Sequence, residues 1–363
     1  MTRPTLAAGL ALVIVSGCNT SRDRAAAEGG WSIDSQATVD IAASRPDGQL
    51  VFGSAVGATR LGDGRLVVAD GYESMVRFFG ASGQPQTVTG RHGSGPGEFQ
   101  SLAWLGQCGQ DSIYVWDRMA SRMSVIDQAG RIVRQSSMQP VPTTLTCARD
   151  GAMLFFGAPE AEAGSVSDMA SVRYRAPLFL SSGADSTPQP LGTMPLGEPR
   201  PLGRMTHIAL TADRMFVGPA DSGLIRAFGR DGRELAPLLL ELEPRRATPR
   251  QYEAAIEQQA ALLPSAADRE PIRKLMRAMP MPAHVPAYSG VLTDPLGVVW
   301  VQLSVPGDGE TRLRGLRDGT AVANLYLPIE GKVFEVGNDH VLLAYQDAEG
   351  NEHVAQFRLL RGR

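Results

Sequence analysis

The sequence contains little of what would point directly to a chemistry. It has three cysteines and five histidines in 363 residues, and the histidines show neither the HxH nor the HExxH spacing of metal sites. Acids and bases are interspersed, with a formal net charge of -3, so no basic stripe predicts a nucleic-acid interface. These absences leave catalytic residues, metal ligands and cofactor sites unassigned, and leave open whether the protein is an enzyme.

Turn-forming residues, in contrast, are plentiful. The chain has 40 glycines and 25 prolines, and helical periodicity is confined to one stretch. This composition is typical of many short strands joined by tight turns. The length would suggest two domains, but repetitive all-β folds of this size often form one.

Residues 1–18 have the features of a targeting segment, which is set apart from the fold. Arg3 supplies a positive charge, and Leu6–Val15 is an apolar stretch too short to span a bilayer. The segment ends in Ser16-Gly17-Cys18. Small residues directly before a cysteine resemble the lipobox of bacterial lipoproteins, which implies that Cys18 is lipidated and becomes the mature N-terminus. The alternative is an ordinary signal peptide with an incidental cysteine.

Asn19 after the cysteine favours the outer membrane over the inner one. Two or more acyl chains on one residue give stable anchoring. We therefore expect an exported protein held on the periplasmic side of the outer membrane. Residues 19–30 contain nothing that could form a core and are interpreted as a flexible tether, which leaves residues 31–363 for the folded domain.

The rest of the chain repeats one pattern six times: a short apolar strand, a polar break, a second apolar strand and a turn with Gly or Asp. The repeats are Gly64–Gln84, Asp111–Arg131, Gly151–Gly183, Asp213–Arg233, Gly297–Gly319 and Asp339–Arg361. One such sheet cannot bury its own apolar faces, whereas radial stacking of six sheets does. We therefore predict an all-β fold, a six-bladed β-propeller.

A known family shows similar repeats. The run Arg91–Phe99 followed by Asp111–Gly130 resembles NHL-type repeats and the six-bladed propeller lipoproteins related to them. The resemblance covers essentially the mature chain and is strongest over 53–133 and 283–360. It implies that a strand near Trp31–Ile41 completes the last blade beside the C-terminal strands. It implies no particular function, because propellers host many activities.

One stretch interrupts the repeat between the fourth and fifth units. Thr248 followed by Pro249 is typical of a helix start, and Pro264 ends that helix. A second helix is predicted before Met279. We expect a helical insertion over about 248–280, which either covers the channel mouth or packs against the flank of the propeller.

The two cysteines besides Cys18 fall at nearly the same repeat position in neighbouring blades. Innermost strands of adjacent blades run side by side, so a bond between Cys108 and Cys147 is within reach. An exported protein permits disulfides. We predict a disulfide, with two reduced buried thiols as the alternative.

Polar residues near the predicted inner strands are candidates for the channel lining. They are Arg60, Gln107, Thr146, Arg204, His207 and Thr293. This mixed basic and neutral set would suit an anionic or carbonyl-bearing ligand; a water-filled channel is the alternative. His207 is either a ligand-facing residue or a hydrogen-bonded core residue, because the aligned repeats place Ala58 and Leu105 at its position and form no ring of ligands.

Two other features have structural interpretations. The glycine-rich Gly90–Phe99 loop lacks the ending of a phosphate loop and is expected to be a tight connection between blades, although His92 and Glu98 carry acid–base groups. Aromatic side chains could stack on a sugar but are expected to pack between blades; these are Trp104, Trp116 and Trp300.

The sequence supports several functions. We expect a lipid-anchored, monomeric binding or scaffold module of the cell envelope, with an unknown protein or small-molecule ligand and no nucleic acid. The alternative is a metal-dependent hydrolase or lyase that uses the central channel, and a third hypothesis is a structural assembly partner. A metal enzyme needs several converging ligands, and the candidate inner strands carry mostly Ala, Leu, Thr and Arg.

Overall fold

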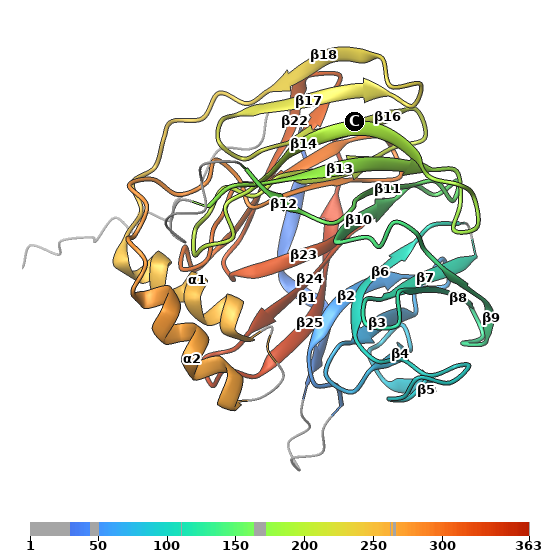
Figure 1. The fold of residues 1–363 in the computed structure, drawn as a ribbon. Coiled ribbons are helices and arrows are strands. Elements are labelled where there is room, and N and C mark those ends of the chain that lie inside the picture. The colour runs from blue at the N-terminus through green and yellow to red at the C-terminus, as the bar shows by residue number, and fades with distance from the viewer. Residues whose placement is uncertain are drawn as a thin grey trace, which may run out of the picture.

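The computed structural model describes residues 30–43, 51–109, 111–162, 172–261, 263 and 266–362. Six antiparallel sheets follow one another along these residues, and their innermost strands contact each other in a closed ring (Figure 1). The predicted six-bladed β-propeller is confirmed. Cys18 and residues 19–29 of the expected tether lie outside the described residues.

The first three blades are formed in chain order. Blade one contains β2 (Ala55–Arg60), β3 (Leu66–Asp70), β4 (Met75–Phe79) and β5 (Pro85–Thr89). Blade two contains β6 (Leu102–Gln107), β7 (Ser112–Asp117), β8 (Arg122–Asp127) and β9 (Ile132–Ser137). Blade three contains β10 (Thr144–Cys147), β11 (Met153–Phe156), β12 (Glu160–Ala161), β13 (Tyr174–Ser181) and β14 (Gln189–Gly197).

The last three blades follow the same order, except for one strand. Blade four contains β15 (His207–Leu210), β16 (Arg214–Gly218), β17 (Leu224–Gly229) and β18 (Glu234–Leu239). Blade five contains β19 (Gly290–Thr293), β20 (Val299–Gln302), β21 (Thr311–Arg317) and β22 (Thr320–Leu327). Blade six contains β23 (Gly331–Val336), β24 (His340–Gln346), β25 (Glu352–Leu360) and, outermost, β1 (Ser32–Ala42).

The N-terminal strand closes the ring. β1 pairs antiparallel with β25, and Figure 1 shows the blue strand beside the red one. Trp31, just before β1, is buried beside Trp300, with ring centroids 5.8 Å apart, and under the guanidinium of Arg361 at 4.6 Å. The closure that the NHL resemblance implied is confirmed by this pairing.

The hydrophobic core is divided among the interfaces between blades. Six clusters of buried apolar side chains each fill the space between two neighbouring blades; between blades one and two, Val67 and Phe78 meet Ile113 and Val115. Because neighbours cover both faces of a blade, strands such as β3 and β11 are buried at every position. This explains why the second strands appear in the sequence as continuous apolar runs.

Two helices interrupt the repeat between β18 and β19, as predicted. They are α1 (Pro249–Ala261) and α2 (Ala266–Arg277). Thr248 caps α1 reciprocally: its amide donates to Gln251 Oε1 at 2.9 Å, and the Gln251 amide donates to its hydroxyl at 3.3 Å. Ala255 of α1 packs with Leu202 and Val305 in a separate buried cluster on the propeller. Neither helix is long and apolar enough to cross a membrane.

Candidate functional site

The inner strands form a ring around the axis of the propeller, and the two ends of this ring differ. Each inner strand begins where the preceding blade ends, so β2, β6, β10, β15, β19 and β23 all run in the same direction. We name the end where these strands begin the upper mouth and the end where they finish the lower mouth. The helices belong to the connection that enters blade five, on the upper rim.

The six residues predicted to line the channel are divided between these mouths. Three of them are the last residues of their inner strands, and a fourth is the last but one; these are Arg60, Gln107, Thr293 and Thr146. His207, in contrast, is the first residue of β15, and Arg204 lies three positions before it. The structure therefore does not bring the six together in one cluster.

Hydrogen bonds join blade six to blade one at the lower mouth. Arg60 Nη1 lies 2.8 Å from Oδ1 of Asp339 and 2.9 Å from Nδ1 of His340. His340 Nε2 lies 2.8 Å from Oε1 of Glu335, whose Oε2 accepts a hydrogen bond from the Thr59 hydroxyl. Thr59 and His340 are buried. Because every member has a partner, this network is suited to holding the two blades together.

Sequence reasoning missed Glu335, and a backbone irregularity explains why. In the pairing of β23 with β24, Val333 lies opposite Leu343 and Glu335 opposite Leu342, so Phe334 is an extra residue. Such a bulge changes the side on which the following residues point. No residue pattern in this segment marks the bulge, so a repeat alignment assigns Glu335 to the wrong face.

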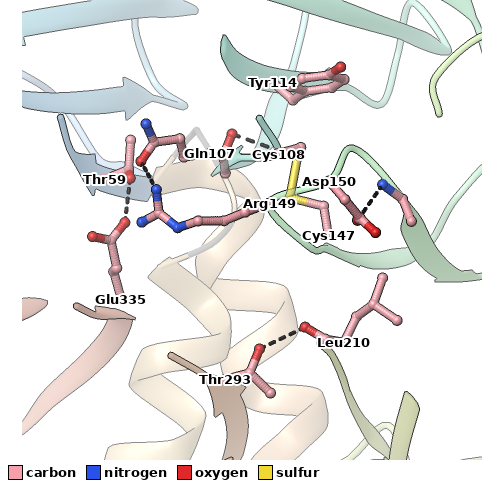
Figure 2. Close-up of a disulfide and its surroundings, with 12 residues drawn as sticks. Thr59, Gln107, Cys108, Tyr114, Cys147, Arg149, Asp150, Leu210, Thr293 and Glu335 are labelled. Atoms are coloured by element: carbon pink, nitrogen blue, oxygen red, sulfur yellow. Dashed lines mark hydrogen bonds between the residues drawn. A yellow bond between two sulfur atoms is a disulfide. The ribbon is translucent and has the colours of Figure 1, made fainter. Parts of the chain in front are cut away.

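Two of the other predicted residues at the lower mouth, Gln107 and Thr293, also have hydrogen-bond partners. Gln107 Oε1 accepts a hydrogen bond of 2.9 Å from Arg149, drawn in Figure 2. Thr293 donates its hydroxyl hydrogen to the carbonyl of Leu210 at 2.8 Å, which links blades five and four. Thr146 lies opposite Leu154 in the pairing of β10 with β11.

Cys108 and Cys147 form the predicted disulfide at the same mouth. Their Cα atoms are 5.4 Å apart, and the bond joins the ends of the inner strands of blades two and three (Figure 2). Gln107 precedes one cysteine directly, and Arg149 follows the other by two residues. A covalent bond and a hydrogen bond thus connect the same two blades at one point.

His207 has a different environment at the upper mouth. It is partly buried and forms no hydrogen bond with a described residue, although its ring lies 5.8 Å from the ring of Tyr288. Burial lowers the pKa of His207 to about 4, so its imidazole is neutral at pH 7. A hydrogen-bonded core histidine would have a partner, and within the described chain His207 has none.

Lys332 is a second polar side chain of the inner ring, and sequence reasoning did not select it. It is the second residue of β23, and its ammonium nitrogen lies 5.3 Å from the centre of the Phe334 ring. Its side chain is exposed to solvent, yet burial lowers the pKa of its ammonium group. The two properties agree if water reaches the side chain while protein surrounds it on all sides, as inside a channel.

The Gly90–Phe99 loop is held by its own side chains. Glu98 accepts a hydrogen bond of 2.8 Å from the Gly95 amide and pairs with Arg91 at 2.7 Å. These bonds hold the pKa of Glu98 below its usual value. Arg122 of β8 donates to the Glu98 carbonyl at 2.5 Å. This geometry supports the interpretation as a tight connection between blades.

Two further results concern the remaining candidates. The tryptophans pack in the clusters between blades, as expected for Trp104, Trp116 and Trp300. Within the described residues, no group of three or more His, Cys, Asp or Glu side chains is arranged to hold a metal ion.

One pocket lies away from the channel. It has a volume of about 380 Å³ and is lined by residues 136–139, at and just after the end of β9, and by residues 184–188 between β13 and β14. Its carboxylate, Asp185, is paired with Arg134 at 2.5 Å. The pocket is therefore on the outer side of blades two and three and shares no residue with either mouth.

No family model matches the chain, and no curated protein matches its sequence. Among solved structures, it is similar to a member of the DUF4221 family from Bacteroides vulgatus, with a TM-score of 0.56 and 11% identity over 92% of this chain and 99% of that one. It is also similar to a putative exported protein from Bacteroides fragilis, with a TM-score of 0.50 and 12% identity over 92% and 96% of the two chains. For virginiamycin B lyase from Staphylococcus aureus, the TM-score is 0.45 at 11% identity, over 91% and 99%. At these identities, the first two similarities show the fold alone.

Proposed function

We propose that this chain is a binding module of the cell envelope that takes a small ligand into the upper part of its central channel. The observation that carries the proposal is the pair His207 and Lys332. Both lie at the start of inner strands, solvent reaches both, and burial lowers the pKa of both. Within the described chain, neither side chain has a hydrogen bond or an ion pair.

Desolvating a polar group without giving it a partner is unfavourable. A channel that leaves two such groups unpaired is suited to a ligand that supplies the partners. Arg204 adds a half-buried guanidinium that forms no ion pair with a described residue. A neutral imidazole, an amine and a guanidinium together favour a ligand with carboxylate or carbonyl oxygens.

We also propose that Cys18 anchors the protein to the outer membrane. Gly30 lies beside Gly362, and β1 begins opposite the end of β25, which finishes on the lower side. The tether would therefore leave from the lower side, and the upper mouth would face away from the membrane. A Cys18→Ala variant should lose incorporated palmitate and become soluble in the periplasm; an unchanged membrane fraction would contradict the anchor.

Native mass spectrometry of the purified chain, incubated with a small-molecule extract of the cell envelope, tests the binding proposal. We expect a retained ligand that is lost in His207→Phe and Lys332→Met and kept in the control Lys274→Met, on the exposed face of α2. No retained ligand, or equal retention in all three variants, would overturn it. The metal content after dialysis tests the alternative enzyme: about one tightly held equivalent would favour the metal-dependent hydrolase or lyase.

A further inference from the structure

Lysine is rare in this chain, and one of its two lysines lies on an inner strand. Of the 35 lysine and arginine residues, only Lys274 and Lys332 are lysines. Lys274 is exposed on α2, whereas Lys332 lies on the inner strand of blade six. A guanidinium stays charged at any pH that a protein tolerates, but an amine can lose its proton and act as a nucleophile.

Burial favours the neutral form of the Lys332 amine. It lowers the pKa of the ammonium group, and the charge of Glu352 raises it by a smaller amount. Phe334 places an aromatic ring 5.3 Å from the ammonium nitrogen, a contact that favours the charged form and so opposes the effect of burial. No ion pair joins Lys332 to a described carboxylate. An accessible and partly desolvated amine without an ion pair is the state in which lysine reacts with carbonyl groups.

Glu352 provides a carboxyl whose charge acts on this amine. Its Oε1 accepts a hydrogen bond of 2.8 Å from the amide of Ala55, at the upper start of β2. Burial raises the pKa of the Glu352 carboxyl, the charge of Lys332 lowers it, and the charge of Asp70 raises it. β25, the third strand of blade six, thus places the Glu352 carboxyl against the upper start of β2. Because its pKa is raised, this carboxyl can hold a proton.

We propose that the Lys332 amine forms an imine with an aldehyde or ketone group of a small ligand in the channel. The nitrogen lone pair adds to the carbonyl carbon, and one amine proton moves to the carbonyl oxygen, which gives a carbinolamine. This intermediate loses its hydroxyl group and the remaining N–H proton as water, and the C=N bond forms without any oxidation or reduction. Glu352 donates the proton to the departing hydroxyl and takes one back from nitrogen.

This inference deepens the proposed function and rests on it for the ligand, but the reactivity of the amine can be measured without the ligand. The purified chain is incubated with butanal and cyanoborohydride, which reduces each imine to a stable butylamine. Peptide mass spectrometry then follows the two lysines separately. We expect Lys332 to be labelled faster than Lys274 at pH 7, because a lowered pKa raises the neutral fraction of the Lys332 amine.

Two variants separate the chemistry from a folding defect. Lys332→Arg keeps the cation and should lose the fast labelling without a change in unfolding temperature. Glu352→Gln should move the pH midpoint of Lys332 labelling down, because a charge that raises its pKa is removed. Above the midpoint, where the amine is neutral in both proteins, the variant should be labelled more slowly. Lys332 labelled no faster than Lys274, or a Lys332 midpoint that Glu352→Gln does not lower, would overturn the proposal.

The result also separates this inference from the proposed function. If Lys332 is labelled fast but the chain retains no envelope ligand, the proposal of a reactive amine is supported and the proposed binding function is contradicted. A retained ligand in a chain whose Lys332 is not preferentially labelled keeps the binding function and overturns the imine.

Discussion

At the lower mouth of the channel, Arg60, Glu335 and His340 each contact a partner, and a disulfide ties the inner strands of two neighbouring blades. At the upper mouth, His207 and Lys332 share the same inner ring but form no hydrogen bond or ion pair within the described residues. The two mouths are the opposite ends of the same six inner strands, which all run in the same direction. They differ in how completely their polar side chains are paired.

This difference suggests a division of roles. Paired buried groups stabilise a fold, whereas unpaired ones cost free energy unless a ligand satisfies them. Departures from complete pairing are expected at functional sites. We therefore expect changes at the lower mouth to alter stability and leave amine reactivity unchanged, and changes at the upper mouth to act on reactivity or on its pH dependence.

The largest effect should follow removal of the disulfide at the lower mouth. The bond between Cys108 and Cys147 closes a separation of 39 residues. Its loss in the double variant Cys108→Ala/Cys147→Ala should lower the free energy of unfolding by about 3–4 kcal/mol, because the unfolded chain gains conformational freedom. Denaturant unfolding measures this loss, and the labelling rate of Lys332 serves as the control. A loss below about 1 kcal/mol would contradict a stabilising role.

The next effect concerns the free energy of unfolding at acidic pH, which depends on His207 at the upper mouth. An unfolded histidine binds a proton as the pH falls through about 6.5, but folded His207 stays neutral down to about 4. Its contribution to the free energy of unfolding is therefore complete above about pH 6.5 and lost progressively between about 6.5 and 4.

Because His207 is partly reached by solvent, we discount this loss to about 2 kcal/mol. The variant His207→Gln should be less sensitive to pH over the same range, and unfolding at pH 7.0 and at pH 4.5 measures the difference. Parallel pH profiles for the two proteins would show that His207 titrates normally in the folded state.

Much of the fold could be predicted from local patterns. The six repeated strand pairs indicated the blades, and Thr248-Pro249 indicated the start of α1, because capping depends on neighbouring residues alone. The disulfide followed from the equivalent repeat positions of Cys108 and Cys147, since a radial repeat places equivalent strand ends side by side.

The candidate site was harder to predict, because it depends on which way each side chain points. His207 and Arg60 were both predicted to line the channel, but they lie at opposite ends of their inner strands: β15 begins at His207 and β2 ends at Arg60. The bulge at Phe334 hid Glu335. Lys332 carried no motif, because only three-dimensional burial reveals a desolvated amine.

A smaller effect should distinguish buried from exposed pairs at the lower mouth. The side chains of His340 and Glu335 are 8% and 15% exposed, whereas that of Asp339 is 64% exposed. Glu335→Gln should lower stability by about 1.5 kcal/mol, since a hydrogen bond to a charged acceptor is lost. The matched control Asp339→Asn should cost less than about 0.5 kcal/mol, because its pair with Arg60 is on the surface. Thermal unfolding compares the two variants, and equal losses would contradict this interpretation of the network.

The smallest effect concerns the helical insert on the upper rim. α2 is attached to α1 partly through exposed ion pairs, such as Arg273 with Glu257 at 2.9 Å. Each such pair contributes less than about 0.5 kcal/mol and is screened by salt. Hydrogen exchange should therefore be faster in α2 at about 1 M salt than at low salt, while exchange in β3 and β11, buried at every position, stays the same. Unchanged exchange in α2 would show that these ion pairs do not hold the insert, which would then depend on apolar packing and on the hydrogen bonds from the Tyr252 hydroxyl to the carbonyls of Met276 and Met279.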